Sequence, residues 1–326
     1  MSHPPAKKAA TSLRESRIPP EFSGQRFDQA LARLFPEYSR SRLTEWIKEG
    51  RALLDGAAAR PRDAVVGGQR VSVEVVEETL TEHAAEDLPL DIVHEDAALI
   101  VVNKPAGLVV HPGAGNRAGT LQNALLHHAP ELAAVPRAGL VHRLDKDTSG
   151  LLVVARTLEA HTRLVAELQA REFEREYLAV ANGVMTGGGT VDAPIKRHAT
   201  DRLRMSVHEG GREAITHYRV LKRFRAHTYV GVRLETGRTH QIRVHLAHIR
   251  HPVVGDPLYG RRIMLPPGAT SRLREVLQSF RRQALHAARL GVTHPLSGER
   301  LQWEVPPPAD MQQLLTALED DLQHGR

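Results

Sequence analysis

The stretch HRLDKDTSGLLVVA, residues 142–155, places two aspartates one residue apart ahead of Thr-Ser-Gly. This order copies the start of a calcium-binding EF-hand loop, with Asp145 and Asp147 as its first ligands and Gly150 at the bend. Such a loop needs a bidentate glutamate at its twelfth position, which is Arg156 here, and a helix on either side. Because GLLVVA has the composition of a strand, we expect no calcium site.

Two nearby carboxylates could instead cleave a glycosidic bond. In an extended segment, residues i and i+2 point to one face about 6.6 Å apart, whereas a glycosidase needs its two carboxylates on opposite sides of the scissile bond. The simpler interpretation is that Asp147, Thr148 and Ser149 build a turn through side-chain to backbone hydrogen bonds, and that Gly150 supplies permissive dihedral angles.

Asp145 has His142, Arg143 and Lys146 as close neighbours in the sequence. Cationic neighbours favour an ionised carboxylate, which could act as a nucleophile or a base. From this stretch alone, a structural ion pair is the simpler interpretation and a catalytic role stays open.

A second dense stretch, LETGRTHQIRVHLAHIRHPVVGDPLYG, covers residues 234–260. No spacing among its four histidines matches a histidine pair on one helix face backed by a glutamate, so we expect no metal. Arg238 and Arg243, with His240 and Gln241 between them, offer donors suited to phosphates and base edges. The same residues could also merely cap and solvate a helix.

Composition excludes several classes of protein. The 326 residues include no cysteine, which excludes disulfides, thiolate zinc sites and cysteine nucleophiles. No apolar run approaches the ~18 residues of a membrane span, and the N-terminus lacks the apolar core of a signal peptide. We therefore expect a soluble, cytoplasmic protein, with a monomer as the default.

Charge is distributed unevenly along the chain. The formal net charge is +6, yet residues 73–96 hold nine acids and no lysine or arginine, so the remainder carries 6 + 9 = +15. Such a balance favours a polyanionic partner, with nucleic acid ahead of an anionic membrane, although an ordinary basic surface would look the same.

The first 80 residues predict a small helix-helix-sheet unit. Residues 1–20 are polar and without apolar periodicity, which predicts a flexible basic arm. Apolar residues at helical spacing predict one helix that stops at Pro36 and a second that follows a cap signal at Ser39 and ends at Gly50. ALLDG and RVSVEVV then read as strands that complete the domain at 21–80.

An acidic linker is predicted at 81–89, followed by a larger α+β domain at 90–326. Short β-branched runs such as ALIVVNK, LLVVA, YLAVA, THYRV and YVGVRLE alternate with turn signals. Helical periodicity appears at 157–171 and 309–322.

Four motifs in order resemble the RluA-type RNA pseudouridine synthases, closest to the RluD-like subgroup that modifies large-subunit ribosomal RNA. They are NKPAGLVVHPG (103–113), VHRLDKDTSGLLVVA (141–155), REYLAVANG (175–183) and ETGRTHQIRVHLAHIRHPVVGDPLYG (235–260). The resemblance implies a curved, mostly antiparallel mixed sheet flanked by helices, and an isomerase that uses neither cofactor nor metal.

The segment SRSRLTEWIKEGRALLDG resembles the S-four-like RNA-binding domain that precedes the catalytic domain in this subgroup. The Gly-Asp that usually follows in that pattern is Gly68-Gln69 here, so no role is expected for that acid. Phosphate contacts are expected from the basic arm, from Arg40, Arg42 and Lys48, and from the stretch KRHATDRLR at 196–204.

The resemblance also implies roles for single residues. The catalytic aspartate falls on Asp145, and the tyrosine that packs on the flipped base falls on Tyr177. The arginine that pairs with the aspartate falls on Arg243, with Arg238 as the alternative in the same motif. Arg143 resembles the residue that fills the gap left in the RNA stack.

RNA contacts are also expected from His142, Arg238, His240 and Gln241 around these residues. Whether the carboxylate attacks C1′, adds to C6 of the base or acts only as a base stays open. Two other functions also stay open at this point, namely a non-catalytic RNA-binding or ribosome-assembly factor, and a glycosidase that releases free base. The presence of Asp145 favours the enzyme over the binding factor.

Overall fold

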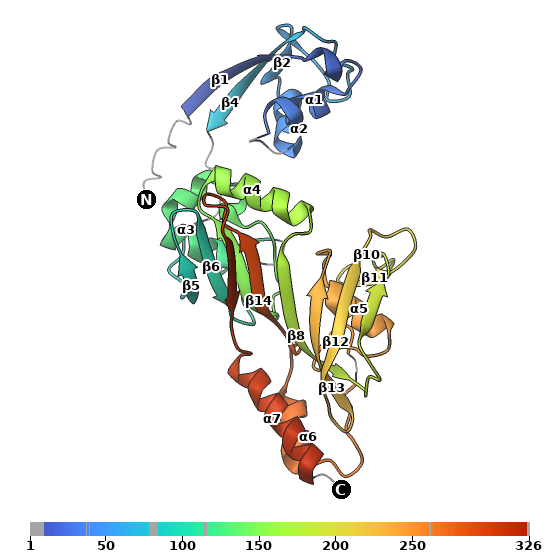
Figure 1. The fold of residues 1–326 in the computed structure, drawn as a ribbon. Coiled ribbons are helices and arrows are strands. Elements are labelled where there is room, and N and C mark those ends of the chain that lie inside the picture. The colour runs from blue at the N-terminus through green and yellow to red at the C-terminus, as the bar shows by residue number, and fades with distance from the viewer. Residues whose placement is uncertain are drawn as a thin grey trace, which may run out of the picture. The chain divides into compact units, whose positions relative to one another are not determined.

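A computed structural model describes residues 10–36, 38, 40–77, 84–113, 116–260 and 262–324. The chain divides into two compact units, Met1–Leu80 and Thr81–Arg326 (Figure 1). Each unit has its own apolar core.

The smaller unit packs two helices on one sheet. The helices are α1 (Phe27–Leu34) and α2 (Arg40–Lys48), after a short 3-10 turn, η1 (Pro20–Phe22). The sheet has the order β1-β4-β2-β3, from β1 (Ala10–Arg17), β4 (Arg70–Glu77), β2 (Ala52–Leu54) and β3 (Ala57–Ala58). The apolar helix positions predicted from spacing are buried against the alternate valines of β4, which explains why these segments fold together. The cap signal at Ser39 lies outside the described residues.

The predicted flexible arm at 1–20 is wrong for Ala10–Arg17, which forms β1 and pairs with the whole length of β4. An edge strand is held by backbone hydrogen bonds and needs no apolar alternation, so its side chains gave no signal. Leu13 is exposed, while Ile18, just after the strand, is buried and anchors it. Residues 1–9 lie outside the described part of the chain.

The larger unit is built on a nine-stranded sheet with the order β5-β6-β7-β14-β8-β13-β12-β9, and β15 pairs with β14. Its strands are β5 (Ile92–Glu95), β6 (Leu99–Lys104), β7 (Ser149–Ala155), β8 (Glu174–Asn182), β9 (Gly189–Asp192), β12 (Ile215–Arg223), β13 (His227–Leu234), β14 (Leu285–Thr293) and β15 (Arg300–Glu304). The β7–β14 ladder is parallel, and the other ladders of this sheet are antiparallel. The predicted α+β class and mostly antiparallel mixed sheet are confirmed.

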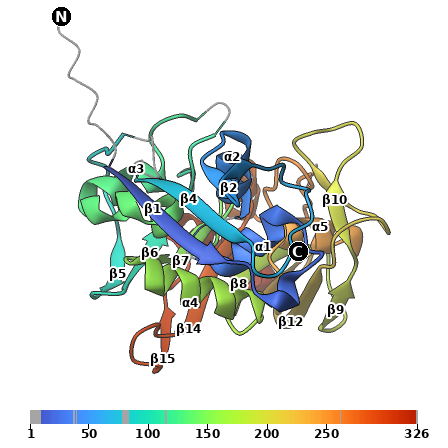
Figure 2. The same cartoon turned by 90° about the horizontal axis from the view of Figure 1, so that it is seen from above.

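Helices flank this sheet and a small hairpin stands beside it (Figure 1). The helical segments are α3 (Leu121–His128), η2 (Pro130–Ala134), η3 (Pro136–Gly139), α4 (Leu158–Gln169), α5 (Gln241–His248), α6 (Ser271–Ser279) and α7 (Ala309–His324). The hairpin consists of β10 (Ile195–Arg197) and β11 (Met205–Val207), and α5 lies next to it (Figure 2). The hairpin therefore brings the basic stretch 196–204 near α5, which belongs to the 234–260 stretch.

Gly150 pins β7 to β14 at the centre of the sheet. Its φ is +113°, and a Cβ at this position would lie 2.2 Å from the carbonyl oxygen of Ala287. No L side chain fits that approach, so the permissive dihedral angle expected of Gly150 is present. The loop carrying Asp145 thus runs directly into a rigid strand junction.

Part of the predicted acidic linker at 81–89 is packed on the larger unit. The Glu86 carboxylate accepts hydrogen bonds from Gly119 N (3.1 Å), and Asn123 Nδ2 donates to the Ala84 carbonyl (2.7 Å). Gly119 directly precedes Thr120, the N-cap of α3, where backbone N–H groups favour a carboxylate. Residues 81–83 lie outside the described part of the chain.

Candidate active site

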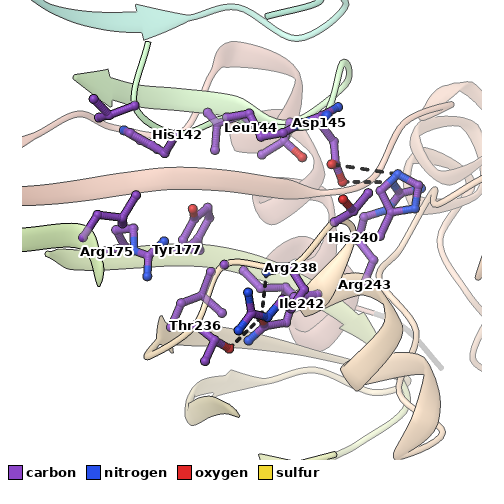
Figure 3. A pocket seen from close by; sticks show the side chains of 18 of the residues that line it. His142, Leu144, Asp145, Arg175, Tyr177, Thr236, Arg238, His240, Ile242 and Arg243 are labelled. Carbon is purple, nitrogen blue, oxygen red and sulfur yellow. Dashed lines mark hydrogen bonds and ion pairs between the residues drawn. The ribbon is translucent and has the colours of Figure 1, made fainter. Parts of the chain in front are cut away.

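One pocket of about 490 Å³ gathers all eight site residues predicted for the larger unit (Figure 3). They are Asp145, Tyr177, Arg243, His142, Arg143, Arg238, His240 and Gln241. The 142–155 stretch supplies one wall, β8 supplies the floor, and the 234–260 stretch supplies the opposite wall. A volume in this range accommodates a small organic ligand.

Asp145 lies opposite Arg243 at one end of the pocket. Arg243 Nη1 donates to Asp145 Oδ2 at 3.0 Å, while its Nε and Nη2 donate to the two oxygens of Asp256 at 2.7 and 2.9 Å. Burial alone would lower the pKa of Arg243, but Asp256 and Asp145 outweigh it and raise that pKa. Arg243 is therefore a permanent cation that aims one N–H group at Asp145.

Asp256 fixes the direction of Arg243. Its carboxylate is fully buried, and Oδ1 also accepts hydrogen bonds from the backbone N–H groups of Leu258 and Tyr259 at 2.9 and 3.1 Å. Two backbone bonds and a bidentate arginine leave this carboxylate little freedom to rotate. Asp256 belongs to the quoted motif but was not among the predicted site residues.

His240 faces the other oxygen of Asp145. Its Nε2 lies 3.9 Å from Asp145 Oδ1, and its Nδ1 is 2.9 Å from the Tyr259 hydroxyl. That hydroxyl accepts a hydrogen bond from Met205 N of β11 (2.8 Å), so its own proton is available for Nδ1. The matching tautomer carries its ring proton on Nε2, directed at Asp145.

A buried lysine supports the loop that carries Asp145. Lys104 Nζ donates to the carbonyls of Pro105, Leu108 and Lys146 at 2.8 to 2.9 Å. Burial lowers the pKa of Lys104 to about 8, against the opposing charges of Asp147 and Asp145. Because Lys146 directly follows Asp145, this lysine ties the loop to the end of β6.

The turn after Asp145 is closed by the backbone. Thr148 N donates to the carbonyl of Asp145 (3.1 Å), whereas Thr148 Oγ1 accepts from Gln283 Nε2 (3.1 Å) and Ser149 Oγ bonds to His286 Nδ1 (2.9 Å). The predicted side-chain to backbone bonds are therefore wrong for these two hydroxyls, which hold the turn to the start of β14.

Tyr177 lies on β8 in the middle of the pocket, and its ring is almost completely buried. Burial raises the pKa of its hydroxyl, with the cation of Arg175 acting in the opposite direction. The phenol is thus neutral at physiological pH and presents an aromatic surface to the cavity. Figure 3 shows this ring between the Asp145 end and the end occupied by His142 and Arg175.

His142 has one ring nitrogen committed to the protein. Its Nε2 accepts a hydrogen bond from Val153 N (3.2 Å), and its ring meets Phe173 edge-on at 6.0 Å. Burial, followed by the charges of Arg175 and His111, lowers the pKa of His142 to about 3. The neutral ring therefore keeps only Nδ1 for the RNA contact that was predicted.

The low pKa of His142 predicts a measurable loss of stability in acid. The native ring takes up no proton until about pH 3, whereas the unfolded ring binds one near pH 6.5, so stability falls as the pH drops through this window. In His142→Gln, the free energy of unfolding should decrease less steeply as the pH drops, by about 1.4 kcal/mol per pH unit. Urea unfolding between pH 4 and 6 measures the slope, and equal slopes in both proteins would contradict the assignment.

Gln241 is a structural residue, and its predicted RNA contact is wrong. Its Oε1 accepts from Thr236 Oγ1 and Arg238 N, and its Nε2 donates to the Ile215 carbonyl and to Thr216 Oγ1, all within 2.8 to 3.0 Å. This buried amide has no hydrogen-bonding capacity left for a ligand.

Arg238 lies at the rim of the pocket, where its Nε donates to the Glu213 carbonyl (2.8 Å). The structure thus places Arg243, and not Arg238, against Asp145. Arg143 is exposed at the pocket wall, where nothing in the geometry opposes an RNA contact.

The three cations predicted in the smaller unit have different surroundings. Arg40 donates through Nε and Nη2 to Oδ2 of buried Asp28 (3.1 and 2.8 Å), an anion that Arg26 also binds. Arg42 lies against the ring of Trp46 at 5.4 Å, and Lys48 is exposed in the last turn of α2. Arg40 is therefore primarily an ion-pair partner inside the domain.

Within the described residues, no group of three or more histidine, aspartate or glutamate side chains is placed to hold a metal ion. In the same part of the chain, no helix is long and apolar enough to cross a membrane.

Comparison with known proteins defines the class to which this fold and pocket belong. Residues 98–248 match the family model of the RNA pseudouridylate synthases. Two human structures share the fold of the larger unit: RNA pseudouridylate synthase domain containing 4 (TM-score 0.55, 27% identity, 70% of this chain and 92% of that chain) and domain containing 1 (0.53, 26%, 73% and 97%).

Bacterial relatives are similar over nearly the whole chain. The ribosomal large subunit pseudouridine synthase D of Xanthomonas campestris is 59% identical over 98% of this chain and 97% of its own. The proteins of the same name from Pseudomonas aeruginosa and Escherichia coli K12 are 57% and 55% identical, covering 94% and 93% of this chain and 96% and 93% of their own. The chain belongs to the RNA pseudouridylate synthase family, and the predicted RluA-type, RluD-like membership is confirmed.

Proposed function

We propose that this protein isomerises specific uridines of large-subunit ribosomal RNA to pseudouridine, with Asp145 as the catalytic carboxylate. The supporting observation is that Asp145, Arg243 and Tyr177, which lie far apart in the sequence, line a single pocket. The ribosomal substrate is inferred from the names of relatives that are 55 to 59% identical.

The reaction needs no second substrate. The N1–C1′ bond breaks, the uracil turns over, a C5–C1′ bond forms and the proton on C5 leaves while N1 gains one, so uridine and pseudouridine are isomers. Attack on C1′, addition to C6 and base catalysis all require one free carboxylate oxygen beside the nucleoside. Arg243 engages Oδ2 of Asp145, while Oδ1 is 3.9 Å from His240 and is the freer of the two.

Tyr177 and Arg143 take the supporting roles in this proposal. A neutral, buried ring at the centre of the pocket suits stacking against an extruded base, which must leave its own stack to reach a carboxylate. Arg143 is exposed close to Asp145, where its planar guanidinium could occupy the gap that the extruded uridine leaves.

Tritium release measures this reaction directly. Large-subunit ribosomal RNA carrying tritium at uridine C5 should lose tritium to water in the presence of the protein, without any release of free uracil. Free uracil in the supernatant would instead indicate a base-excising glycosidase. A protein that binds the RNA and releases neither product would be a binding or assembly factor.

We further propose that the smaller unit is an S-four-like RNA-binding domain, as its sequence resemblance implies. Lys48, which is exposed, and Arg42, which is half-buried, lie on α2, and the exposed Arg197 and Arg202 belong to the basic hairpin of the larger unit. Phosphate contacts by such side chains would set affinity and salt dependence but would not identify the target uridine.

Arg40 and Lys48 form a matched pair for testing this domain. Arg40→Gln should lower the free energy of unfolding by about 1 to 3 kcal/mol, because buried Asp28 loses two charged donors. Lys48→Gln should leave stability unchanged, weaken RNA binding and reduce the salt slope of log K by about 0.7 to 0.9. Thermal unfolding and filter binding separate the two, and identical effects from both changes would contradict these assignments.

We also propose that the protein acts in the cytoplasm, as a monomer, on ribosomal RNA or on the assembling large subunit. Support comes from the substrate in the names of its bacterial relatives. Sedimentation at working concentration, with and without RNA, tests the monomer.

A further inference from the structure

Arg175, on β8, is a buried guanidinium without a partner in the described part of the chain. It is 6% exposed, and its Nε is enclosed without a hydrogen bond. Among the described residues, no carboxylate, carbonyl or hydroxyl accepts a hydrogen bond from it. Burial also lowers its pKa, the mark of an uncompensated cation. Such a charge destabilises the free protein, so its presence calls for a ligand that neutralises it.

The carboxylates beside Arg175 in the sequence are occupied elsewhere. Glu174 and Glu176 lie on the other face of β8, since alternate residues of a strand point to opposite faces. Glu174 pairs with Arg300 at 3.1 Å, and Glu176 lies within 3.7 Å of Arg289.

The carboxylates that line the pocket are occupied as well. Asp145 pairs with Arg243 at 3.0 Å. Glu235 bonds to His217 at 2.5 Å and lies 3.6 Å from Arg171. The pocket therefore holds a buried cation that its own acids do not compensate.

The position of Arg175 indicates what its ligand is attached to. Arg175 and Tyr177 are two residues apart on one strand and face the same cavity. Figure 3 shows Arg175 beside Tyr177 and His142, at the opposite end from Asp145 and Arg243. A nucleotide with its base at Tyr177 and its sugar towards Asp145 would thus extend another group to Arg175.

We propose that Arg175 is a phosphate subsite, which binds a backbone phosphodiester next to the uridine engaged by Asp145. A uracil carbonyl could accept a hydrogen bond there but would leave the positive charge uncompensated, whereas a phosphodiester neutralises it and matches the planar guanidinium. The nature of the ligand rests on the proposed function, because it assumes that the pocket takes RNA.

Removing this charge should have opposite effects on the free protein and on the complex. Arg175→Met keeps the length of the side chain and removes its charge. The melting temperature without RNA should rise, because a buried unpaired cation is gone. Affinity for RNA should fall roughly 10- to 100-fold, as for one lost charge-assisted hydrogen-bonding group. An arginine that merely supports the fold would give a lower melting temperature.

Binding is measured in an Asp145→Asn background, so that turnover does not intervene. The RNA is a fluorescent large-subunit ribosomal fragment that contains a uridine modified by the wild-type protein. Arg175→Met should reduce the salt slope of log K by about 0.7 to 0.9, and Arg175→Lys should retain most of that slope. A neutral methylphosphonate in place of the phosphodiester beside the target uridine should weaken RNA binding by the protein that keeps Arg175. The same replacement should cause no further loss of affinity in the Arg175→Met variant.

Arg272→Met is the matched control, because Arg272 is an exposed arginine on α6 that pairs with Asp320. It should change neither the affinity nor the salt slope. An Arg175→Met protein that melts lower, or binds RNA with an unchanged slope, would overturn the subsite while tritium release by the wild type stands. A wild type that releases no tritium would overturn the proposed function, and the difference in salt slope caused by Arg175→Met on an RNA that the protein binds would still decide the subsite.

Discussion

Asp145→Asn should reduce tritium release by about 10⁴-fold or more while leaving RNA affinity within a few-fold of the wild type. The amide keeps the volume of the carboxylate and can still accept the hydrogen bond from Arg243 Nη1. It supplies neither a nucleophilic oxygen nor a base, so the chemical step loses its reactive group. Single-turnover tritium release and fluorescence anisotropy on the same RNA measure the two quantities.

Asp147→Asn is the natural control, because it makes the same change two residues further along the loop. Asp147 is the largest opposing charge at buried Lys104, so its loss should lower stability and disturb the placement of the loop. Turnover by the folded protein should persist at a reduced rate. Activity that survives in Asp145→Asn would remove Asp145 from the catalytic role. Activity that disappears in a fully folded Asp147→Asn would contradict the purely structural role of Asp147.

Asp256→Asn should lower the free energy of unfolding by about 3 to 5 kcal/mol, as expected for breaking a buried ion pair. The new amide would turn its NH₂ group towards the Arg243 guanidinium or towards two backbone N–H groups, all of them donors. Arg243 would then lose the anchor that aims it at Asp145. Turnover should fall much more than RNA binding, and urea unfolding with single-turnover assays reports both effects.

Asp310→Asn supplies the comparison, because Asp310 makes the same bidentate contact with Arg282, at 2.6 and 2.7 Å. The Asp310 side chain is 48% exposed, whereas that of Asp256 is fully buried. Because water solvates the exposed Asp310 carboxylate, its substitution should cost much less than that of Asp256. Equal destabilisation by the two substitutions would mean that burial does not set the strength of the Asp256–Arg243 pair.

Much of the architecture could be predicted from local patterns. The helical spacing around Leu31 and Trp46 and the β-branched runs that became β6 and β7 correspond to the observed elements. The order of four motifs gave the family, which the comparisons confirm. The β1 strand could not be predicted, because its pairing with β4 rests on backbone bonds that leave no pattern in the side chains.

The residues that hold the pocket in shape were harder to predict than those that line it. A glutamine between two arginines looks like a nucleic-acid contact, yet the Gln241 NH₂ group donates to Thr216 and to the Ile215 carbonyl, which lie more than twenty residues away. Nothing in the sequence distinguishes Lys104 from other lysines. Its role follows from the three backbone carbonyls that accept its hydrogen bonds. Such roles depend on long-range partners, which spacing in one sequence does not reveal.

Gly150 fixes the length of chain between the central sheet and Asp145. A strand can shift in register only by two residues if its side chains are to keep their faces, and such a shift would bring Thr148 or Leu152 against the Ala287 backbone, where no side chain fits. The number of residues between the sheet centre and Asp145 is therefore fixed by sterics rather than by the chemistry of the loop. A shift of the strand register therefore cannot compensate for an insertion or deletion between Asp145 and Gly150. This segment of the chain can vary in composition but not in length.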